Sequence, residues 1–409
     1  MAEIDKIFST LKNAKGGIEL IIEVSDKEKA YNTLRRFGRC RAFELIPYLA
    51  LECSVKDAER LASLKYKERR SWLLSREVRS ALEQILSIEP SAKVSIPPMR
   101  KGINYSLDHG ERLWNLENIG AYEAWKLSTG SEVSVGVIDT GCDYSHPEIS
   151  SRFSDDKGFD FILNNSKPMD LNGHGTHVAG IIAGRNCGVA PGARLYALRV
   201  LDEDGSGSEA TVMLGIEWAL KKRLQIVNMS LGAPDYSEAF KELCYYAHKH
   251  GLIMCAAAGN DAAPIYDYPA SFQPVISVAA VDRMNRHAYF SNINDLVDIS
   301  APGVEIVSSY PGGSYRMLSG TSMAAPHVSG AIALGLSLGM DVNLVERRLA
   351  DTAQPISQQG VPQEAFGAGL VRADALLSNY YDSKIARILS GQSSKASVPC
   401  WRDWNVPRR

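Results

Sequence analysis

Four polar residues of this chain could together carry out acyl transfer at a carbonyl group. Ser322 stands in "SGTSMAAPHVSG", where small residues and a nearby proline predict the start of a helix, with Pro326 in its first turn. The free backbone N–H groups of a helix start stabilise developing negative charge. A hydroxyl nucleophile also needs a base, an acid that orients the base, and an oxyanion donor. His174 in "NGHGTHVAGIIAG", Asp139 in "VIDTGCDYSHPE" and Asn260 in "AAAGN" supply one of each.

Each of these residues also has a plainer interpretation when it is taken alone. Ser322 can cap a helix, and Asp139 can cap a turn. His174 can fill a gap between glycines, and Asn260 can be an ordinary turn residue. The chain order acid, histidine, serine is, however, one of the three orders in which Ser-His-Asp catalysis occurs. The combination therefore indicates nucleophilic catalysis, which no single residue does.

The elements that must position these residues read as a buried parallel sheet. Five apolar segments, each typical of a strand, alternate with helical segments at 210–223 and 237–251. The strand segments are 132–139, 194–201, 224–232, 252–260 and 275–281. Strands that are apolar on both faces predict an α/β fold with helices on both sides of the sheet. Ligands of such sheets bind beyond the carboxyl ends of the strands, where Asp139 and Asn260 are expected.

The chain changes character near residue 100. Before it we predict a strand at 18–24, a helix at 25–38, two strands within 41–55, helices after 56 and at 75–86, and a closing strand at 92–96. This order predicts a small α+β unit of ferredoxin-like type. After residue 377 the chain contains the linker-like "SGQSSKAS".

Composition excludes several classes of partner. The 409 residues are 45% hydrophobic and 22% charged, with a formal net charge of −2, so we expect neither a nucleic-acid nor a membrane partner. No apolar run approaches the roughly 20 residues that span a bilayer. The seven cysteines show no metal-binding spacing, and the N-terminus has no export-signal pattern. A cytoplasmic location is favoured, with secretion as the alternative if an export signal has been removed.

The motifs resemble those of the subtilisin-like serine proteases. "VIDTGCDYSHPE", "GHGTHVAGII", "NMSLG", "AAAGN" and "GTSMAAPHVSG" match that family's blocks in type, order and spacing, over roughly residues 110–376. The resemblance implies a doubly wound parallel sheet of subtilisin type over 106–376. It implies that Asp139 orients the imidazole, that His174 takes the Ser322 proton, and that Asn260 and the Ser322 N–H bind the oxyanion. Protein or peptide substrates are expected, with no cofactor for the chemistry and a monomeric state.

The resemblance also divides the chain. Residues 1–105, with a core at about 17–97, would be a ferredoxin-like propeptide that assists folding and inhibits the enzyme. Its last segment would run through the active site like a substrate, and the enzyme would cut it near residues 100–107. Arg100, Lys101 and Tyr105 are the candidate cleavage positions. The extension at 377–409 has no assigned role.

The same resemblance implies a groove that binds extended peptides by strand addition. One wall would contain Gly205, Ser206 and Gly207, and the other Ser230, Leu231 and Gly232, which line the primary specificity pocket with Ala258 and Gly259. Asp267 falls where the family commonly has glycine at the pocket floor. A carboxylate there would favour a basic substrate residue before the scissile bond. The alternative is that a shifted loop points Asp267 into solvent.

Calcium is the one metal that the resemblance raises. Glu148 corresponds to an acid of the family's tight calcium site, but "IIAGRNCGVAPGA" at 181–193 is too short for the usual oxygen-rich loop. We therefore expect that site to be absent, and assign no metal ligands.

Two other functions fit the sequence less well. A catalytically silent peptide-binding protein would typically have lost one of the four site residues, and this chain keeps all four. An α/β-hydrolase esterase would place its serine before the acid and the histidine, within G-x-S-x-G.

Overall fold

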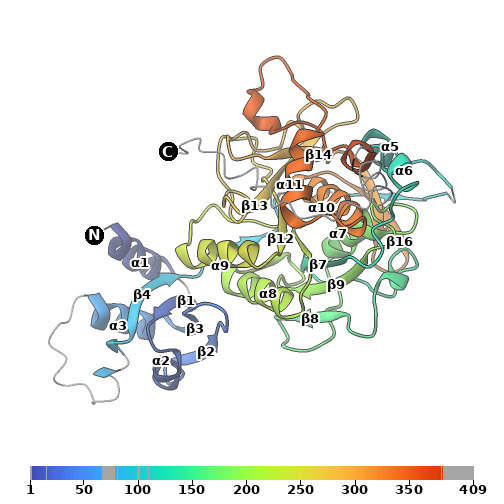
Figure 1. Ribbon diagram of the computed structural model, residues 1–409. Coiled ribbons are helices and arrows are strands. Elements are labelled where there is room, and N and C mark those ends of the chain that lie inside the picture. The colour runs from blue at the N-terminus through green and yellow to red at the C-terminus, as the bar shows by residue number, and fades with distance from the viewer. Residues whose placement is uncertain are drawn as a thin grey trace, which may run out of the picture.

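The computed structural model describes residues 2–14, 16–66, 79–80, 82–98, 102–108, 110–378 and 380. The chain forms two bodies, a small N-terminal unit and a larger α/β unit (Figure 1). Arg100 and Lys101, the extension beyond residue 380 and part of the helix predicted at 75–86 lie outside the described residues. The predicted end of that helix is wrong, because Ile85 and Leu86 begin a strand.

A seven-stranded parallel sheet forms the centre of the larger unit. Its strand order is β14-β13-β12-β11-β7-β9-β8. The strands are β7 (Ser134–Asp139), β8 (Gly158–Asp160), β9 (Arg194–Arg199), β11 (Ile226–Met229), β12 (Ile253–Ala257), β13 (Val275–Val281) and β14 (Ile299–Pro302). The central strands are buried along nearly their whole length, because helices cover both faces. The short edge strands β8 and β14 were not predicted.

Two pairs of helices lie on opposite faces of this sheet. On one face α7 (His174–Ala183) and α10 (Thr321–Ser337) pack against each other, and α11 (Val342–Asp351) packs on α10. On the other face lie α8 (Glu209–Lys221) and α9 (Glu238–Lys249), nearest to the N-terminal unit (Figure 1). Separate hydrophobic clusters fill the two faces. The predicted doubly wound α/β fold is therefore confirmed.

Smaller elements surround this core. An antiparallel sheet has the order β15-β16-β6. Its strands are β15 (Ile306–Tyr310), β16 (Ser314–Leu318) and β6 (Ile103–Tyr105), and the short helices are α5 (Trp114–Asn118), α6 (Ala121–Ala124), η1 (Ser150–Arg152) and η2 (Gln363–Phe366). Because β6 pairs with β16, the chain that leaves the N-terminal unit is held on the larger unit.

The N-terminal unit contains an antiparallel sheet of order β2-β3-β1-β4. Its elements are α1 (Ala2–Asn13), β1 (Gly17–Val24), α2 (Lys27–Leu34), β2 (Gly38–Ala42), β3 (Tyr48–Ser54), α3 (Val55–Tyr66) and β4 (Ile85–Pro90). From β1 onward this is the predicted β-α-β-β-α-β order, while α1 was not predicted. The prediction that 92–96 closes the sheet is wrong, because β4 takes that place beside β1.

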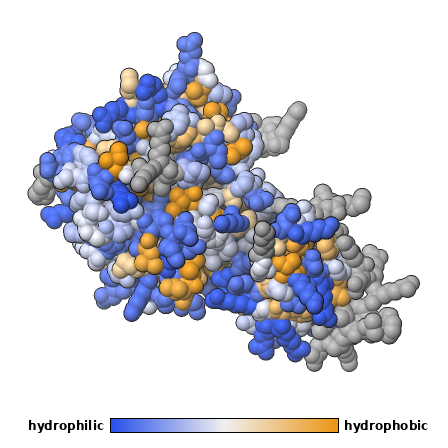
Figure 2. All heavy atoms as spheres, turned by 180° about the vertical axis from the view of Figure 1, so that it is seen from behind, coloured by the Kyte–Doolittle hydropathy of each residue, from blue (hydrophilic) through white to orange (hydrophobic). Residues whose placement is uncertain are grey.

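The residues of the mispredicted strand instead join the larger unit. β5 (Lys93–Ser95) pairs antiparallel with β10 (Ser206–Ser208), away from its own sheet. On the face shown in Figure 2, hydrophilic atoms separate the hydrophobic ones into small clusters on both units. In the described part of the chain, no helix has the length and apolar character needed to cross a bilayer.

Candidate active site

Asp139 and His174 form a buried pair at the carboxyl edge of the sheet. Asp139 ends β7 and His174 begins α7, and His174 Nδ1 lies 2.7 Å from Asp139 Oδ1 and 3.0 Å from Oδ2. The next helix residue, Gly175, is needed here, because a Cβ on it would lie 2.1 Å from the Gly141 carbonyl oxygen. The pairing fixes the imidazole so that Nε2 is the free nitrogen, as a general base requires.

Asp170 holds the start of α7 and was missed by the sequence analysis. Its carboxylate accepts hydrogen bonds from the backbone N–H groups of Gly173 and Thr176 and from the hydroxyls of Thr140 and Thr176. Burial raises the pKa of Asp170, and these hydrogen bonds oppose that shift. Asp170 lies in a loop without hydrophobic periodicity, so only its position shortly before the "GHGTH" motif could have indicated it.

Ser322 is the second residue of α10, and its carbonyl oxygen accepts no hydrogen bond from the residue four positions later, which is Pro326. Pro326 lies beyond the predicted first turn, in the helix interior, and has no N–H to donate to the carbonyl of residue 322. The Ser230 hydroxyl donates to this carbonyl instead, at 2.8 Å. Asn228 in turn donates to the Ser230 hydroxyl, also at 2.8 Å. The proline thus makes room for a polar link between α10 and the end of β11.

The side chain of Ser322 is turned away from the base in this structure. Ser322 Oγ donates to the Ser230 carbonyl oxygen at 3.3 Å. His174 Nε2 is buried and has no hydrogen-bond partner within the part of the chain that the structure describes. The structure therefore pairs acid with base, and packs α7 on α10, but does not join base to nucleophile.

Asn260 is held so that only its amide nitrogen is free to bind a carbonyl. Its Oδ1 accepts from the backbone N–H and the hydroxyl of Thr321, at 2.9 and 2.8 Å. Its Nδ2 donates to the carbonyl oxygen of Pro98 at 3.0 Å. Asn260 is thus tied to the residue beside Ser322, with its donor directed at a peptide carbonyl.

A peptide segment of the chain itself occupies the predicted groove. Ser95 and Gly232 exchange two backbone hydrogen bonds of 3.1 and 3.0 Å, and Ile96 donates to the Gly205 carbonyl at 3.0 Å. On the other side, Ser206 and Gly207 pair with Ser95 and Val94. Segment 93–98 is therefore a strand inserted between two edges of the larger unit.

Pro97 of the inserted strand lies where a further backbone hydrogen bond to the groove would otherwise form. Continuing the register by two residues from Ser95 and Gly232 places Pro97 opposite Ser230. Pro97 is buried and has no N–H, so it cannot donate to the Ser230 carbonyl. The Ser322 hydroxyl takes that acceptor instead. The position of Pro97 gives a physical reason for the orientation of Ser322.

Two further buried histidines are held by backbone carbonyls. His177 Nε2 lies 3.0 Å from the Arg316 carbonyl oxygen, and His327 Nδ1 lies 2.8 Å from that of Met323. Burial lowers the pKa of His177 to about 3 and that of His327 to about 4. Both imidazoles are neutral near pH 7 and serve packing.

The Glu148 carboxylate faces hydrogen-bond donors of the chain itself. Its carboxylate accepts hydrogen bonds from the Asn186 backbone N–H at 2.8 Å, from the Asn186 side-chain amide and from the Tyr315 hydroxyl at 3.0 Å. Calcium requires six to eight oxygen ligands, whereas here N–H and O–H donors face the carboxylate. Among the described residues no group of three or more His, Cys, Asp or Glu side chains is arranged to hold a metal.

Comparison with known proteins shows which family this chain resembles. Residues 130–369 match the model of the subtilase family. The chain belongs to the subtilase family. The matched region covers the seven-stranded sheet and all four candidate site residues, and the family's named relatives include serine proteinases and subtilisins.

Three relatives show how far the similarity extends. The thermophilic serine proteinase of Bacillus sp. (strain AK1) is 42% identical over 246 residues, which cover 59% of this chain and 60% of the relative. Subtilisin NAT of Bacillus subtilis subsp. natto is 45% identical over 219 residues, 51% of this chain and 56% of the relative. Subtilisin Savinase of Lederbergia lenta is 39% identical over 270 residues, 64% of this chain and 97% of the relative. The chain thus spans 60% and 56% of the length of the first two.

Proposed function

We propose that this protein is a serine endopeptidase that is made as a zymogen and hydrolyses peptide bonds of protein or peptide substrates. The observation that carries the proposal is the buried pair of His174 and Asp139, whose Nδ1 and Oδ1 atoms lie 2.7 Å apart. His174 begins α7, which packs against α10, the helix that bears Ser322. The Asn260 amide, bonded to a peptide carbonyl of an inserted strand, supports it.

The proposed mechanism uses groups that the fold already holds in place. Once Ser322 Oγ turns from the Ser230 carbonyl to His174 Nε2, the imidazole takes its proton as Oγ attacks the substrate carbonyl. Asp139, which is fully buried, stabilises the imidazolium that forms. Asn260 Nδ2 and the Ser322 N–H at the start of α10 donate to the oxyanion. His174 then protonates the leaving nitrogen. In the second half of the reaction His174 takes a proton from water, which attacks the acyl-enzyme, and returns the proton to Ser322 Oγ.

The N-terminal unit would be the inhibitor of this site. Its Glu89 accepts hydrogen bonds from the Ala239 N–H and the Ser237 hydroxyl at the start of α9, each at 3.2 Å. Its Ser91 accepts from the Ala210 N–H at the start of α8 at 3.3 Å. Capping of two helix starts stabilises the contact by about 1 kcal/mol each. Apolar residues of the unit, Phe43 and Tyr48 among them, are buried in the cluster that covers α8 and α9.

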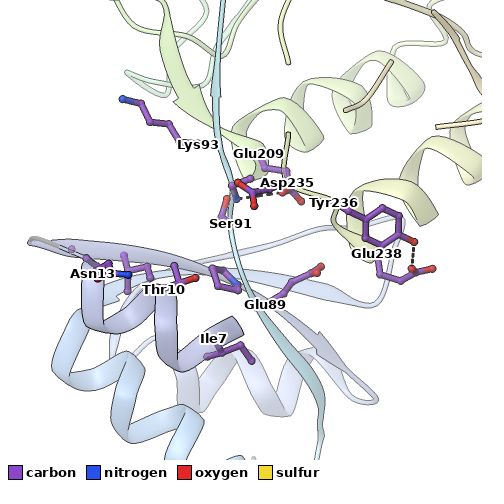
Figure 3. A pocket seen from close by; sticks show the side chains of 15 residues that line it. Ile7, Thr10, Asn13, Glu89, Ser91, Lys93, Glu209, Asp235, Tyr236 and Glu238 are labelled. Atoms are coloured by element: carbon purple, nitrogen blue, oxygen red, sulfur yellow. Dashed lines mark hydrogen bonds between the residues drawn. The ribbon is translucent and has the colours of Figure 1, made fainter. Parts of the chain in front are cut away.

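A cavity of about 940 Å³ remains between the two bodies. Figure 3 shows α1 residues, among them Ile7 and Thr10, on one side of it and Glu209 and Tyr236 on the other, with the chain from Glu89 to Lys93 between them. The contact is thus incompletely packed, which suits a unit that must leave after processing.

Processing would occur after segment 93–98 has left its present position. The carbonyl that Asn260 binds is that of Pro98, before the proposed cleavage interval of residues 100–107. Tyr105 is held in β6, where it pairs with Tyr315. A bond within the interval therefore reaches Ser322 only when the chain shifts along the groove or β6 detaches.

The test is to produce the full chain beside a Ser322→Ala variant and to follow mass and N-terminal sequence with time. We expect the wild type to shorten by about ten kilodaltons, the scale of a unit of roughly 100 residues, and the variant to remain whole. Hydrolysis of unfolded peptides should appear only in the wild type. Shortening of both chains at the same rate would point to a contaminating protease and refute the proposal.

A catalytically silent or permanently blocked peptide-binding protein is the second candidate. The unpartnered His174 Nε2 and the filled groove favour it, because both leave the site shut. Removal of the N-terminal unit by limited digestion separates the two candidates. Hydrolysis that appears after removal and depends on Ser322 supports the zymogen, and its absence supports the silent protein.

A further inference from the structure

Asp267 lies behind the groove, between two of its walls. A Cβ built on Gly259 would fall 2.1 Å from Asp267 Oδ2, and one built on Gly232 would fall 3.4 Å from Asp267 Cβ. Both walls are glycine at these points, so their backbones approach the Asp267 side chain closely. The alternative that Asp267 points into solvent is contradicted by its exposure of only 7%.

Among the described residues, the carboxylate of Asp267 has one polar side-chain partner and no cation. Asn292 Nδ2 lies 3.3 Å from its Oδ2, and 3.5 Å from an oxygen of Asp261. Within the described part of the chain, no Lys or Arg forms an ion pair with Asp267. Burial raises the pKa of Asp267 to about 6, and the charge of Asp261 adds to the shift. A buried carboxylate without a cation is costly unless a ligand supplies the charge.

The register of the inserted strand shows which substrate residue would face this carboxylate. The residue opposite Ser230 follows the Ser95–Gly232 pair by two positions, and the Ser230 carbonyl is the one that accepts from the Ser322 hydroxyl. Asn260 binds the carbonyl of the next residue, Pro98, so the inserted strand rests one residue beyond the register in which Asn260 would bind the carbonyl of the residue opposite Ser230. In this chain that residue is Pro97, whose side chain is short. A substrate with a long side chain at that position would extend it between the walls of residues 230–232 and 258–260, toward Asp267.

We propose that Asp267 makes the primary specificity pocket select Lys or Arg as the residue before the scissile bond. This inference rests on the proposed peptidase function and names its substrate class. The flexible stem of Lys or the longer stem of Arg would lie along the glycine walls, and the charged head would pair with the carboxylate. Asn292 would act as a positioning residue that holds the carboxylate in the pocket.

The experiment uses enzyme released from its own full chain and four peptides that differ only in the residue before the scissile bond. We expect kcat/KM for Lys and Arg to exceed that for Leu and Phe by about 30-fold or more, the smaller end of what a desolvated charge pair contributes. Asp267→Asn should remove this preference. Asp261→Asn, a change in an exposed acid nearby, is the matched control and should keep the preference.

Each outcome decides between the proposals. Equal or greater rates on Leu and Phe in the wild type, unchanged by Asp267→Asn, would overturn the role of Asp267 while leaving a working protease. Hydrolysis that never depends on Ser322 would overturn the proposed function, and this inference with it. Should Asp267→Asn fail to fold, benzamidine provides the second measurement on the wild type. Competitive inhibition by this small cation supports an acidic pocket, and no inhibition contradicts it.

Discussion

Glu209, at the contact between the two bodies, should make the stability of the unprocessed chain depend on pH. Its backbone N–H donates to the Ala92 carbonyl at 2.9 Å, and its Oε2 accepts from the Ala92 N–H at 3.3 Å. Burial raises the pKa of Glu209 from 4.5 to about 8, and the charges of Glu89 and Glu19 add to the shift. Hydrogen bonds from Ser237 and Ala92 oppose it. Figure 3 shows Glu209 and Glu89 at the same cavity.

The sign and size follow from proton linkage. The carboxyl is protonated in the folded chain up to about pH 8, and in the unfolded chain only below its ordinary pKa of 4.5. The stabilisation is therefore full below pH 4.5 and is lost as pH rises toward 8. The two pKa values correspond to a loss on the order of 2 to 5 kcal/mol, the upper figure being the full linkage energy. For a chain of 409 residues that is a fall of roughly 2 to 6 °C in the unfolding midpoint.

The assay compares Ser322→Ala with the double variant Ser322→Ala, Glu209→Gln by thermal unfolding between pH 5 and 9. Glutamine keeps an oxygen for the Ala92 N–H but does not titrate, so the effects of other groups cancel in the difference. We expect the two midpoints to separate as pH rises, with the glutamate chain less stable. Parallel profiles across this range would refute the assigned role of Glu209.

Three further predictions concern the site and its surroundings. Asn260→Ala should lower kcat by about 10²- to 10³-fold with little change in KM, the size of loss that removal of one oxyanion-hole donor causes in subtilisin; an unchanged kcat would remove Asn260 from the oxyanion site. Pro97→Ala restores an N–H opposite Ser230 that would hold segment 93–98 more tightly in the groove, so self-shortening in a time course should become slower; an unchanged or faster rate would contradict the role given to Pro97. Chelation with EDTA should leave the unfolding midpoint within about 1 °C, whereas Glu148→Ala should cost about 1 to 3 kcal/mol by stranding buried donors; a large effect of EDTA would reveal a stabilising metal.

Much of the fold was predictable because hydrophobic patterning is a local signal. Strands that are apolar on both faces predicted the parallel sheet, and the rule that ligands meet strand carboxyl ends directed attention to Asp139 and Asn260. The segment 92–96 shows the limit of this reasoning. Its alternation fits a strand, but the local sequence does not say which strand it pairs with. In the structure its residues pair with β10 and not with β1. Helix α1 was missed, although it carries an apolar stripe that includes the buried Ile7 and Leu11.

The finer features of the site depend on contacts between distant segments. The orientation of Ser322 follows from Pro97, 225 positions earlier in the chain, and from the carbonyl of Ser230. The burial of Asp267 depends on two glycine walls, and that of Glu209 on the arrival of Ala92. Propensity and spacing contain no information about such contacts, because the residues involved are ordinary in their local sequence.

The most direct test of the central claim is to identify which residue a serine-reactive organophosphorus reagent modifies. The reagent would be added to the full chain after self-shortening, and the adduct located by peptide mass mapping. We predict one adduct, on Ser322, that disappears in His174→Ala because the hydroxyl is then no longer activated. A chain that cleaves peptides while Ser322 remains unmodified, or an adduct that persists in His174→Ala at the wild-type rate, would contradict the account.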